Sequence, residues 1–138
     1  KFETLPVGRG RRLREGADVA LLTVGTVGNA AARAAGRAAA EGVSVAHYDL
    51  RFVKPLDEAL LDEVGRKFRR VVTVEDGSLR GGVGEAVTAF FNARGCEVAV
   101  HSLGIGDEWV DHGTPAQLYA LCGYDEEGIL RALLAAGK

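Results

Sequence analysis

Four short apolar runs alternate with segments of helical pattern, and this alternation constrains the fold more than any other feature of the sequence. The runs lie at residues 18–24, 43–49, 71–75 and 97–103, and Ala-rich or amphipathic segments separate them. Runs that are apolar almost throughout are typical of strands covered on both faces. The sequence therefore predicts an α/β fold, with a doubly wound, mostly parallel sheet of about five strands and helices on both faces.

The first residues are patterned differently from the rest. Residues 1–17 are rich in turn-forming residues, which is typical of a linker or lead-in, with a possible antiparallel edge strand at residues 11–14. Residues 18–138 hold the strand and helix pattern and are predicted to form one domain. The chain begins with Lys1 and contains no methionine, so we expect a processed protein or a piece of a longer one, and we favour a piece.

Three helix starts carry local capping signals. Asp57 is the expected N-cap of a helix that runs to about Phe68. Thr114 opens a capping box and is followed by Pro115, a residue favoured at the first helical position. Asp125 is the expected cap of the last helix. Helices are therefore predicted at these three positions.

The junction at residues 49–57 joins the second predicted strand to the helix after it, and it carries more charge than capping needs. Asp49, Arg51 and Lys54 have no part in the cap. In a parallel sheet this junction lies at the carboxyl ends of the strands, where α/β proteins place functional loops. A solvated surface turn and a functional site both explain these charges, and the residues alone do not separate the two interpretations.

Two glycine-containing turns raise the question of phosphate binding. Gly25 follows the first strand and Asp49 ends the second, but Val27 and Ala30 break the dinucleotide fingerprint, which argues against NAD. Residues 81–84 form a better anion-binding loop at a helix start. The loop lacks the Lys-Ser/Thr pair of nucleoside triphosphatases, and tight turning or packing against a neighbouring domain explains its glycines equally well.

The remaining polar residues define no complete active site. The loop at residues 104–113 lacks the ligand spacing of a zinc site, and we interpret it as a solvated acidic loop. His47 and His101 lie inside predicted strands, where packed or interface histidines are expected. No nucleophile elbow or Ser-His-Asp order is present. The polar residues of the loop at residues 104–113, which we considered as metal ligands, are Asp107, Glu108, Asp111 and His112.

Charge and cysteine content argue against several classes of protein. The formal net charge is -2, and there is no basic excess or aromatic series of the kind that binds nucleic acid. No apolar run approaches the length of a membrane span, and there is no signal-peptide pattern, so neither a membrane protein nor a secreted one is indicated. Cys96 and Cys122 lack metal or redox spacing, and we expect two reduced thiols in a cytoplasmic protein.

Five motifs taken together resemble a known family. They are residues 49–57 (DLRFVKPLD), 72–76 (VTVED), 81–84 (GGVG), 103–107 (LGIGD) and 111–114 (DHGT). In this combination they resemble the C-terminal domain of the 1-deoxy-D-xylulose-5-phosphate synthase family, within the transketolase superfamily, and the lead-in resembles the linker that enters that domain. The resemblance covers essentially the whole chain. Transketolases and the beta subunits of 2-oxo-acid dehydrogenases share the pattern more loosely.

The resemblance implies a full-length transferase that is a cytoplasmic homodimer and uses thiamine diphosphate and Mg²⁺. Such an enzyme condenses pyruvate with D-glyceraldehyde 3-phosphate, releases CO2, and makes 1-deoxy-D-xylulose 5-phosphate for isoprenoid, thiamine and pyridoxal biosynthesis. In this family the two preceding domains hold the cofactor, and the third contributes to packing and to the dimer. We therefore assign no catalytic, cofactor-binding or metal residue here, and we expect the chain alone to bind no cofactor and to be inactive.

Charges and glycines at one edge of a sheet without chemistry of its own lead us to expect docking on the preceding domains of the same enzyme. Two alternatives remain: a free-standing interaction module with a transketolase-like fold, and the C-terminal domain of a 2-oxo-acid dehydrogenase beta subunit. Residues 51–54 and 112–113 favour the synthase. The candidate interface residues are Asp49, Arg51, Lys54, Glu75, Gly81, Gly82, Gly84 and His112.

Overall fold

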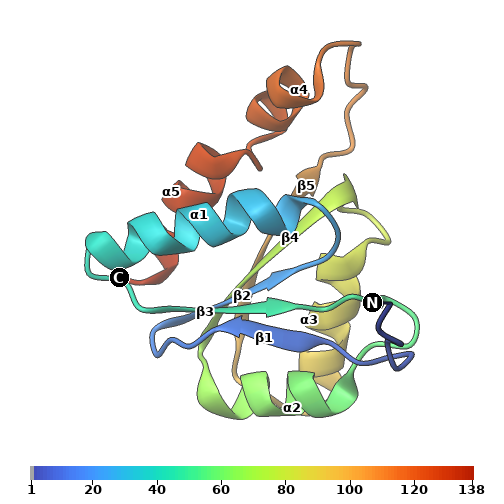
Figure 1. The fold of residues 1–138 in the computed structure, drawn as a ribbon, viewed down its shortest axis with the longest axis vertical. Helices are drawn as coiled ribbons and strands as arrows, with labels where there is room; N and C mark the ends of the chain where they lie inside the picture. The colour runs from blue at the N-terminus through green and yellow to red at the C-terminus, as the bar shows by residue number, and fades with distance from the viewer. Residues whose placement is uncertain (1) are drawn as a thin grey trace.

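The computed structural model describes residues 2–138, which form one five-stranded sheet with helices on both faces (Figure 1). The sheet has the order β1-β3-β2-β4-β5, with β1 antiparallel to β3 and the other neighbours parallel. The predicted doubly wound, mostly parallel α/β sheet is therefore confirmed. The elements are β1 (Arg11–Arg14), β2 (Val19–Thr23), α1 (Val27–Ala40), β3 (Val45–Asp49), α2 (Glu58–Lys67), β4 (Arg70–Ser78), α3 (Val83–Ala93), β5 (Ala99–Ile105), α4 (Pro115–Cys122) and α5 (Glu126–Ala136).

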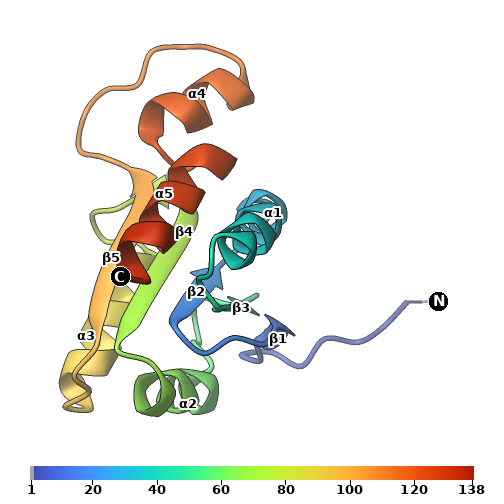
Figure 2. The ribbon, with the colours of Figure 1, turned by 90° about the vertical axis from the view of Figure 1, so that its left-hand side faces the viewer.

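Helices α1 and α5 cover one face of the sheet, and α2 and α3 cover the other (Figure 2). Alternate residues of the central strands point into the two layers, so Leu21 packs under α1 and α5, while Ala20 and Leu22 pack over α2 and α3. All five residues of β2 are buried. This explains why its sequence reads as a continuous apolar run and not as an alternating one.

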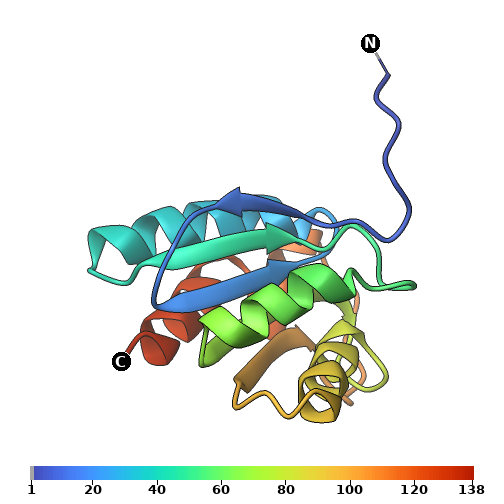
Figure 3. The ribbon, with the colours of Figure 1, turned by 90° about the horizontal axis from the view of Figure 1, so that it is seen from below.

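The lead-in is tied to the sheet and to α2. Strand β1 lies beside β3, while the first described residues of the chain extend away from the domain (Figure 3). Arg11 donates from Nε to Asp49 Oδ2 over 3.0 Å. The buried Asp57 carboxylate accepts from the Leu60 amide at 3.1 Å, as an N-cap does, and from the Gly10 amide at 3.0 Å. One carboxylate thus starts α2 and also fastens the lead-in to it.

The predicted strand bounds are wrong at two places, both in the half of the sheet that contains β4 and β5. Strand β4 was expected to end at residue 75 and runs to Ser78, because Ser78 pairs with Ile105 beyond an irregularity and Leu79 donates to the Ile105 carbonyl. Strand β5 was expected at residues 97–103 and lies two residues later. Asp76 and Gly77 read as turn residues in sequence, but pairing with a neighbouring strand outweighs that local preference.

His47 is a packed core histidine, as one of the two interpretations of this residue expected. It is 1% exposed on β3, and its Nε2 lies 2.8 Å from Thr23 Oγ1. Burial lowers the pKa of His47 from 6.5 to about 4, against a smaller opposing effect of the nearby Asp49 carboxylate. The imidazole is therefore neutral at neutral pH. His101, by contrast, is exposed on β5.

The burial of His47 predicts a pH dependence of stability. The pKa is lower in the folded chain than in the unfolded chain, so protonation favours unfolding. We expect the free energy of unfolding to hold its full value above about pH 6.5 and to fall by up to about 3 kcal/mol as the pH drops toward 4. Urea unfolding across this range measures the loss. In a His47→Gln variant most of this pH dependence should disappear, whereas a His101→Gln variant should keep it. Identical pH profiles for wild type and His47→Gln would contradict the assignment.

Candidate functional site at the carboxyl edge of the sheet

The loop after β3 holds three of the candidate residues in a fixed arrangement. Asp49 Oδ1 accepts from the Arg51 amide at 3.1 Å, and the Arg51 Nε lies 3.9 Å from Asp49 Oδ2. Arg51 has a φ of 56°, which is uncommon for a residue other than glycine and occurs mainly where surrounding contacts hold it. Beyond it, Val53 and Lys54 are exposed. The loop therefore presents an apolar and a cationic side chain from a backbone that Asp49 holds.

Glu75 is buried and closes the start of helix α3. One carboxylate oxygen accepts from the Val83 amide at 2.9 Å and the other from the Gly84 amide at 3.0 Å. Free amides at a helix start carry partial positive charge, and a carboxylate there is stabilising. The helix has no side-chain cap from its own N-cap residue, Gly82. Glu75, on the preceding strand, supplies that function.

The glycines of the loop are required by this packing. A Cβ on Gly82 would stand 2.6 Å from both Glu75 carboxylate oxygens and would collide with the Ser78 carbonyl. A Cβ on Gly84 would collide with the Ser102 hydroxyl. Gly81 has a φ of +71°, in the left-handed region that favours glycine. The glycine loop is therefore shaped by contacts inside the domain.

These contacts decide between the two interpretations of the glycine loop. An anion site needs helix amides that face solvent, whereas the amides of Val83 and Gly84 already bind Glu75. The loop thus does not fit the diphosphate of a cofactor, and the structural interpretation of its glycines is the better one. Glu75 itself is turned inward, so it contributes to the edge by shaping the loop and not by projecting from it.

A second carboxylate, Asp76, was not identified from the sequence. Doubly wound sheets place ligands where neighbouring strands connect to opposite faces, here between β2 and β4. Just beyond that point the Asp76 carboxylate accepts from the hydroxyls of Tyr119 at 2.9 Å and Tyr124 at 2.8 Å. The Tyr119 bond to Asp76 raises the pKa of that phenol, and burial together with the Asp76 bond raises the pKa of Tyr124. Both phenols stay protonated and hold α4 and the start of α5 over the end of β4.

The segment from Gly106 to Cys122 projects beyond the sheet (Figure 1). It contains the acidic loop and α4, and no residue of α4 is buried. His112 and Trp109 are exposed, and Asp107 pairs with Arg80 at 3.4 Å between two exposed side chains. In the described part of the chain, no three His, Cys, Asp or Glu residues are placed to hold a metal ion. Among the described residues of the acidic loop there is therefore no such ligand cluster.

The structure brings the candidates together only in part. Asp49, Arg51 and Lys54 share one loop, and Glu75 and the three glycines share another. His112 belongs to the projecting segment, which lies away from the loop after β3 (Figures 1 and 2). Cys96 and Cys122 are free thiols. Within residues 2–138, no helix combines the length and the apolar character that a membrane crossing needs.

Residues 8–129 match the family described as transketolase, C-terminal domain, and the chain belongs to this family. Its relatives include the 1-deoxy-D-xylulose-5-phosphate synthase of Bacteroides fragilis, 52% identical over 133 residues that make up 96% of this chain and 20% of the relative. The synthase of Symbiobacterium thermophilum is 44% identical over 128 residues, 93% of this chain and 20% of the relative. The resemblance to the C-terminal domain of these synthases is thereby confirmed. The chain spans about a fifth of the length of these curated relatives.

A solved structure agrees with the fold. It is described as a split gene transketolase, inactive beta4 tetramer, and it is 31% identical to this chain with a TM-score of 0.87. The match covers 97% of this chain and 45% of that chain. The transketolase C-terminal-type fold is therefore confirmed by shape as well as by sequence.

Removal of the Glu75 carboxylate should destabilise the domain. Glu75→Ala leaves two buried amides without an acceptor, and we expect a loss of about 2–4 kcal/mol in the free energy of unfolding. Glu75→Gln keeps one carbonyl acceptor and should lose less. The matched control is Glu85→Ala, which removes an exposed carboxylate that accepts from the Gly81 amide in the same loop and should cost less than about 1 kcal/mol. Urea unfolding gives the values, and equal losses for Glu75→Ala and Glu85→Ala would contradict this account.

Proposed function

We propose that this chain is the non-catalytic C-terminal domain of a 1-deoxy-D-xylulose-5-phosphate synthase. The whole enzyme condenses pyruvate with D-glyceraldehyde 3-phosphate and releases CO2, with thiamine diphosphate and Mg²⁺ held by its other domains. The observation that carries the proposal is the identity to such synthases over nearly the full chain, 52% across 133 residues in one case. Other domains of the same enzyme are then the partners of this one.

The site geometry supports a structural role. The glycine loop at residues 81–84 has the amides that follow it bound to Glu75, and the Asp76 carboxylate near the end of β4 accepts from the hydroxyls of Tyr119 and Tyr124. These internal contacts support a domain that binds no ligand at these positions. Catalytic work is left to domains that precede this one in the relatives.

The docking surface that we propose is the carboxyl edge of the sheet, centred on the loop after β3. Arg51 and Lys54 supply positive charge, and the exposed Val53 supplies apolar area between them. Asp49 holds this loop. The neighbouring loop, before α3, is shaped by Glu75 together with Gly81, Gly82 and Gly84. His112 belongs to the projecting segment and contacts a more distant part of the partner. We also propose that the enzyme is a homodimer, as the resemblance to the synthase family implies.

Calorimetry tests the proposal that this chain has no cofactor site of its own. Titration of the 138-residue chain with thiamine diphosphate and Mg²⁺ is expected to give no binding heat and no product from pyruvate and glyceraldehyde 3-phosphate. Addition of the preceding domains of the enzyme should restore both binding and product formation. Tight binding by the chain alone would overturn the assignment of roles.

Charge reversal in the loop after β3 should weaken docking. Arg51→Glu and Lys54→Glu are each expected to raise the dissociation constant for the preceding domains by at least about tenfold. Each variant puts a negative side chain where the proposed contact uses a positive one, so attraction to the partner surface becomes repulsion. Arg66→Glu is the matched control, since this exposed arginine lies in the last turn of α2, away from the loop. Co-sedimentation and turnover of the reassembled enzyme give the readouts. Unchanged turnover and unchanged assembly size in both loop variants would contradict the proposal.

A further inference from the structure

The lead-in contacts both ends of the charged loop after β3. At the start of the loop, Arg11 Nε donates to Asp49 Oδ2 at 3.0 Å. At its end, the Gly10 amide donates to Asp57 Oδ2 at 3.0 Å, and Arg9 adds a contact to the other oxygen of that carboxylate. The loop that carries the proposed docking charges is therefore held at each end by neighbouring residues of the lead-in.

Two glycines of the lead-in permit this close approach. Gly8 has a φ of +73°, and a Cβ there would stand 2.9 Å from Cγ of Pro55, in the middle of the loop. A Cβ on Gly10 would stand 2.9 Å from the Asp49 carbonyl oxygen. A side chain at either position would have to displace the lead-in or the loop. The two segments therefore fit each other along the whole length of the loop.

Asp49 is the residue through which the lead-in reaches Arg51. Its Oδ2 accepts from Arg11, and its Oδ1 accepts from the Arg51 amide at 3.1 Å. The Arg51 Nε lies 3.9 Å from the same Oδ2, a distance too long for a hydrogen bond. Arg11 thus occupies the oxygen that the Arg51 side chain would otherwise bind. It also fixes the carboxylate that holds the Arg51 backbone, whose φ is 56°.

The charges of these three residues leave Arg51 uncompensated. Two guanidinium groups share the single Asp49 carboxylate, so the group as a whole is positive. Without Arg11, the carboxylate and Arg51 could form a neutral pair with the two parallel hydrogen bonds that arginine favours. A neutral pair attracts a carboxylate on a partner less than a free guanidinium does. Arg11 therefore keeps the charge of Arg51 available at the edge of the sheet.

We propose that Arg11 is a positioning residue for the loop after β3, and that this loop has its docking shape only when the lead-in is seated beside β3. The group that Arg51 then meets is a carboxylate on the preceding domains of the same enzyme. The segment that connects the domains in sequence thus also prepares the surface by which they dock. This rests on the docking proposed above and adds the residue that sets the loop.

Docking and seating of the lead-in are then coupled in both directions. Strand β1 is four residues long and exposed throughout, so it opens more readily than the buried strands. If the seated lead-in favours docking, docking favours the seated lead-in by the same factor. The Gly10 amide, bound to Asp57, reports on the seated state. Its hydrogen exchange should slow at least about fivefold when the preceding domains saturate the chain, and an unchanged rate would contradict the coupling.

Exchange of the Arg51 amide and the affinity for the preceding domains test the role of Arg11. In the 138-residue chain, Arg11→Gln should speed exchange of the Arg51 amide at least about fivefold. The same variant should raise the dissociation constant for the preceding domains at least about fivefold. Arg11→Lys keeps a cationic donor and should restore most of both values. No change in either quantity with Arg11→Gln would overturn the proposal.

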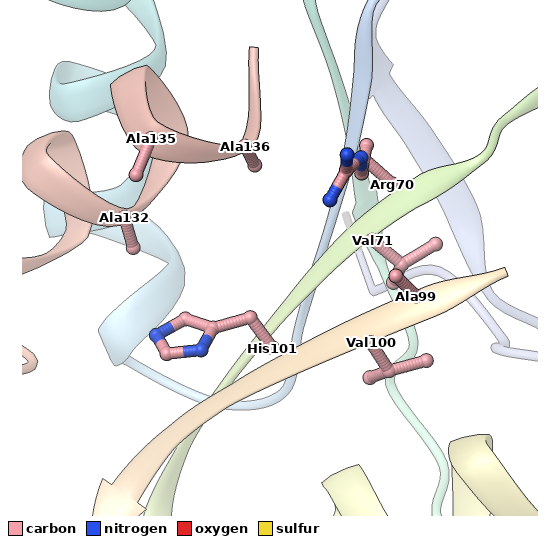
Figure 4. A pocket seen from close by; sticks show the side chains of 8 residues that line it. All are labelled: Arg70, Val71, Ala99, Val100, His101, Ala132, Ala135 and Ala136. Atoms are coloured by element: carbon pink, nitrogen blue, oxygen red, sulfur yellow. The ribbon is translucent and has the colours of Figure 1, made fainter. Parts of the chain in front are cut away.

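Two other exposed arginines serve as matched controls. Arg14 lies at the far end of the same strand. Arg70 begins β4, at the amino edge of the parallel strands, where it lines a groove of about 230 Å³ together with His101 and several alanines (Figure 4). Arg14→Gln and Arg70→Gln remove the same charge and should leave exchange of the Arg51 amide and the affinity within about twofold of wild type. Losses equal to that of Arg11→Gln in both controls would indicate an effect of net charge and overturn the proposal.

A double-mutant cycle shows whether Arg11 acts through Arg51. Arg51→Gln removes the charge that meets the partner, so the addition of Arg11→Gln should change the dissociation constant by less than about twofold. Additive losses would mean that Arg11 contacts the partner itself, and they would overturn the positioning role.

The two proposals fail separately. If Arg51→Gln docks as wild type does, the docking at this loop is disproved, and exchange of the Arg51 amide in the Arg11→Gln chain still decides whether the lead-in sets the loop. If Arg51→Gln weakens docking and Arg11→Gln does not, the positioning role alone is disproved.

Discussion

Burial of β2 on both faces is the constraint on which the rest of the structure depends. Its five side chains are 0–1% exposed, so the strand is stable only when a layer of helices covers each face. Right-handed connections then send α1 to one face and α2 and α3 to the other. The carboxyl ends of the parallel strands must meet at a single edge, and the charged loop after β3 and the loop before α3 both emerge there.

At that edge the chain uses its own carboxylates where other α/β proteins bind ligands. Glu75 occupies the amides that start α3, and Asp76 draws two phenols over the end of β4. Each carboxylate satisfies donors that would otherwise call for a bound anion or water. The amides at the start of α3 and the two phenols are in this way bound within the domain itself.

Features that depend on near neighbours in the sequence were predictable, and those that depend on distant ones were not. The caps at Asp57 and Asp125 each bind an amide three residues on, so their type and position could be read directly. The fold class followed from the apolar runs, whereas the strand order was known only from the structure. The partners of Glu75, in contrast, lie eight and nine residues away across a loop, and Asp76 is 43 and 48 residues from its tyrosines. The hydroxyl of a buried tyrosine needs a hydrogen-bond partner, but no spacing rule in the sequence identifies which carboxylate accepts from it.

The double use of Asp57 has a mechanical consequence. Its carboxylate grips the Gly10 amide and the first turn of α2 at once, and Arg9 adds a contact at 3.4 Å. Residues 2–9 are therefore followed directly by two attachments, the contacts with Asp57 at the start of α2 and the pairing of β1 with β3. The lead-in acts as an anchored tether whose direction is set by the domain it enters.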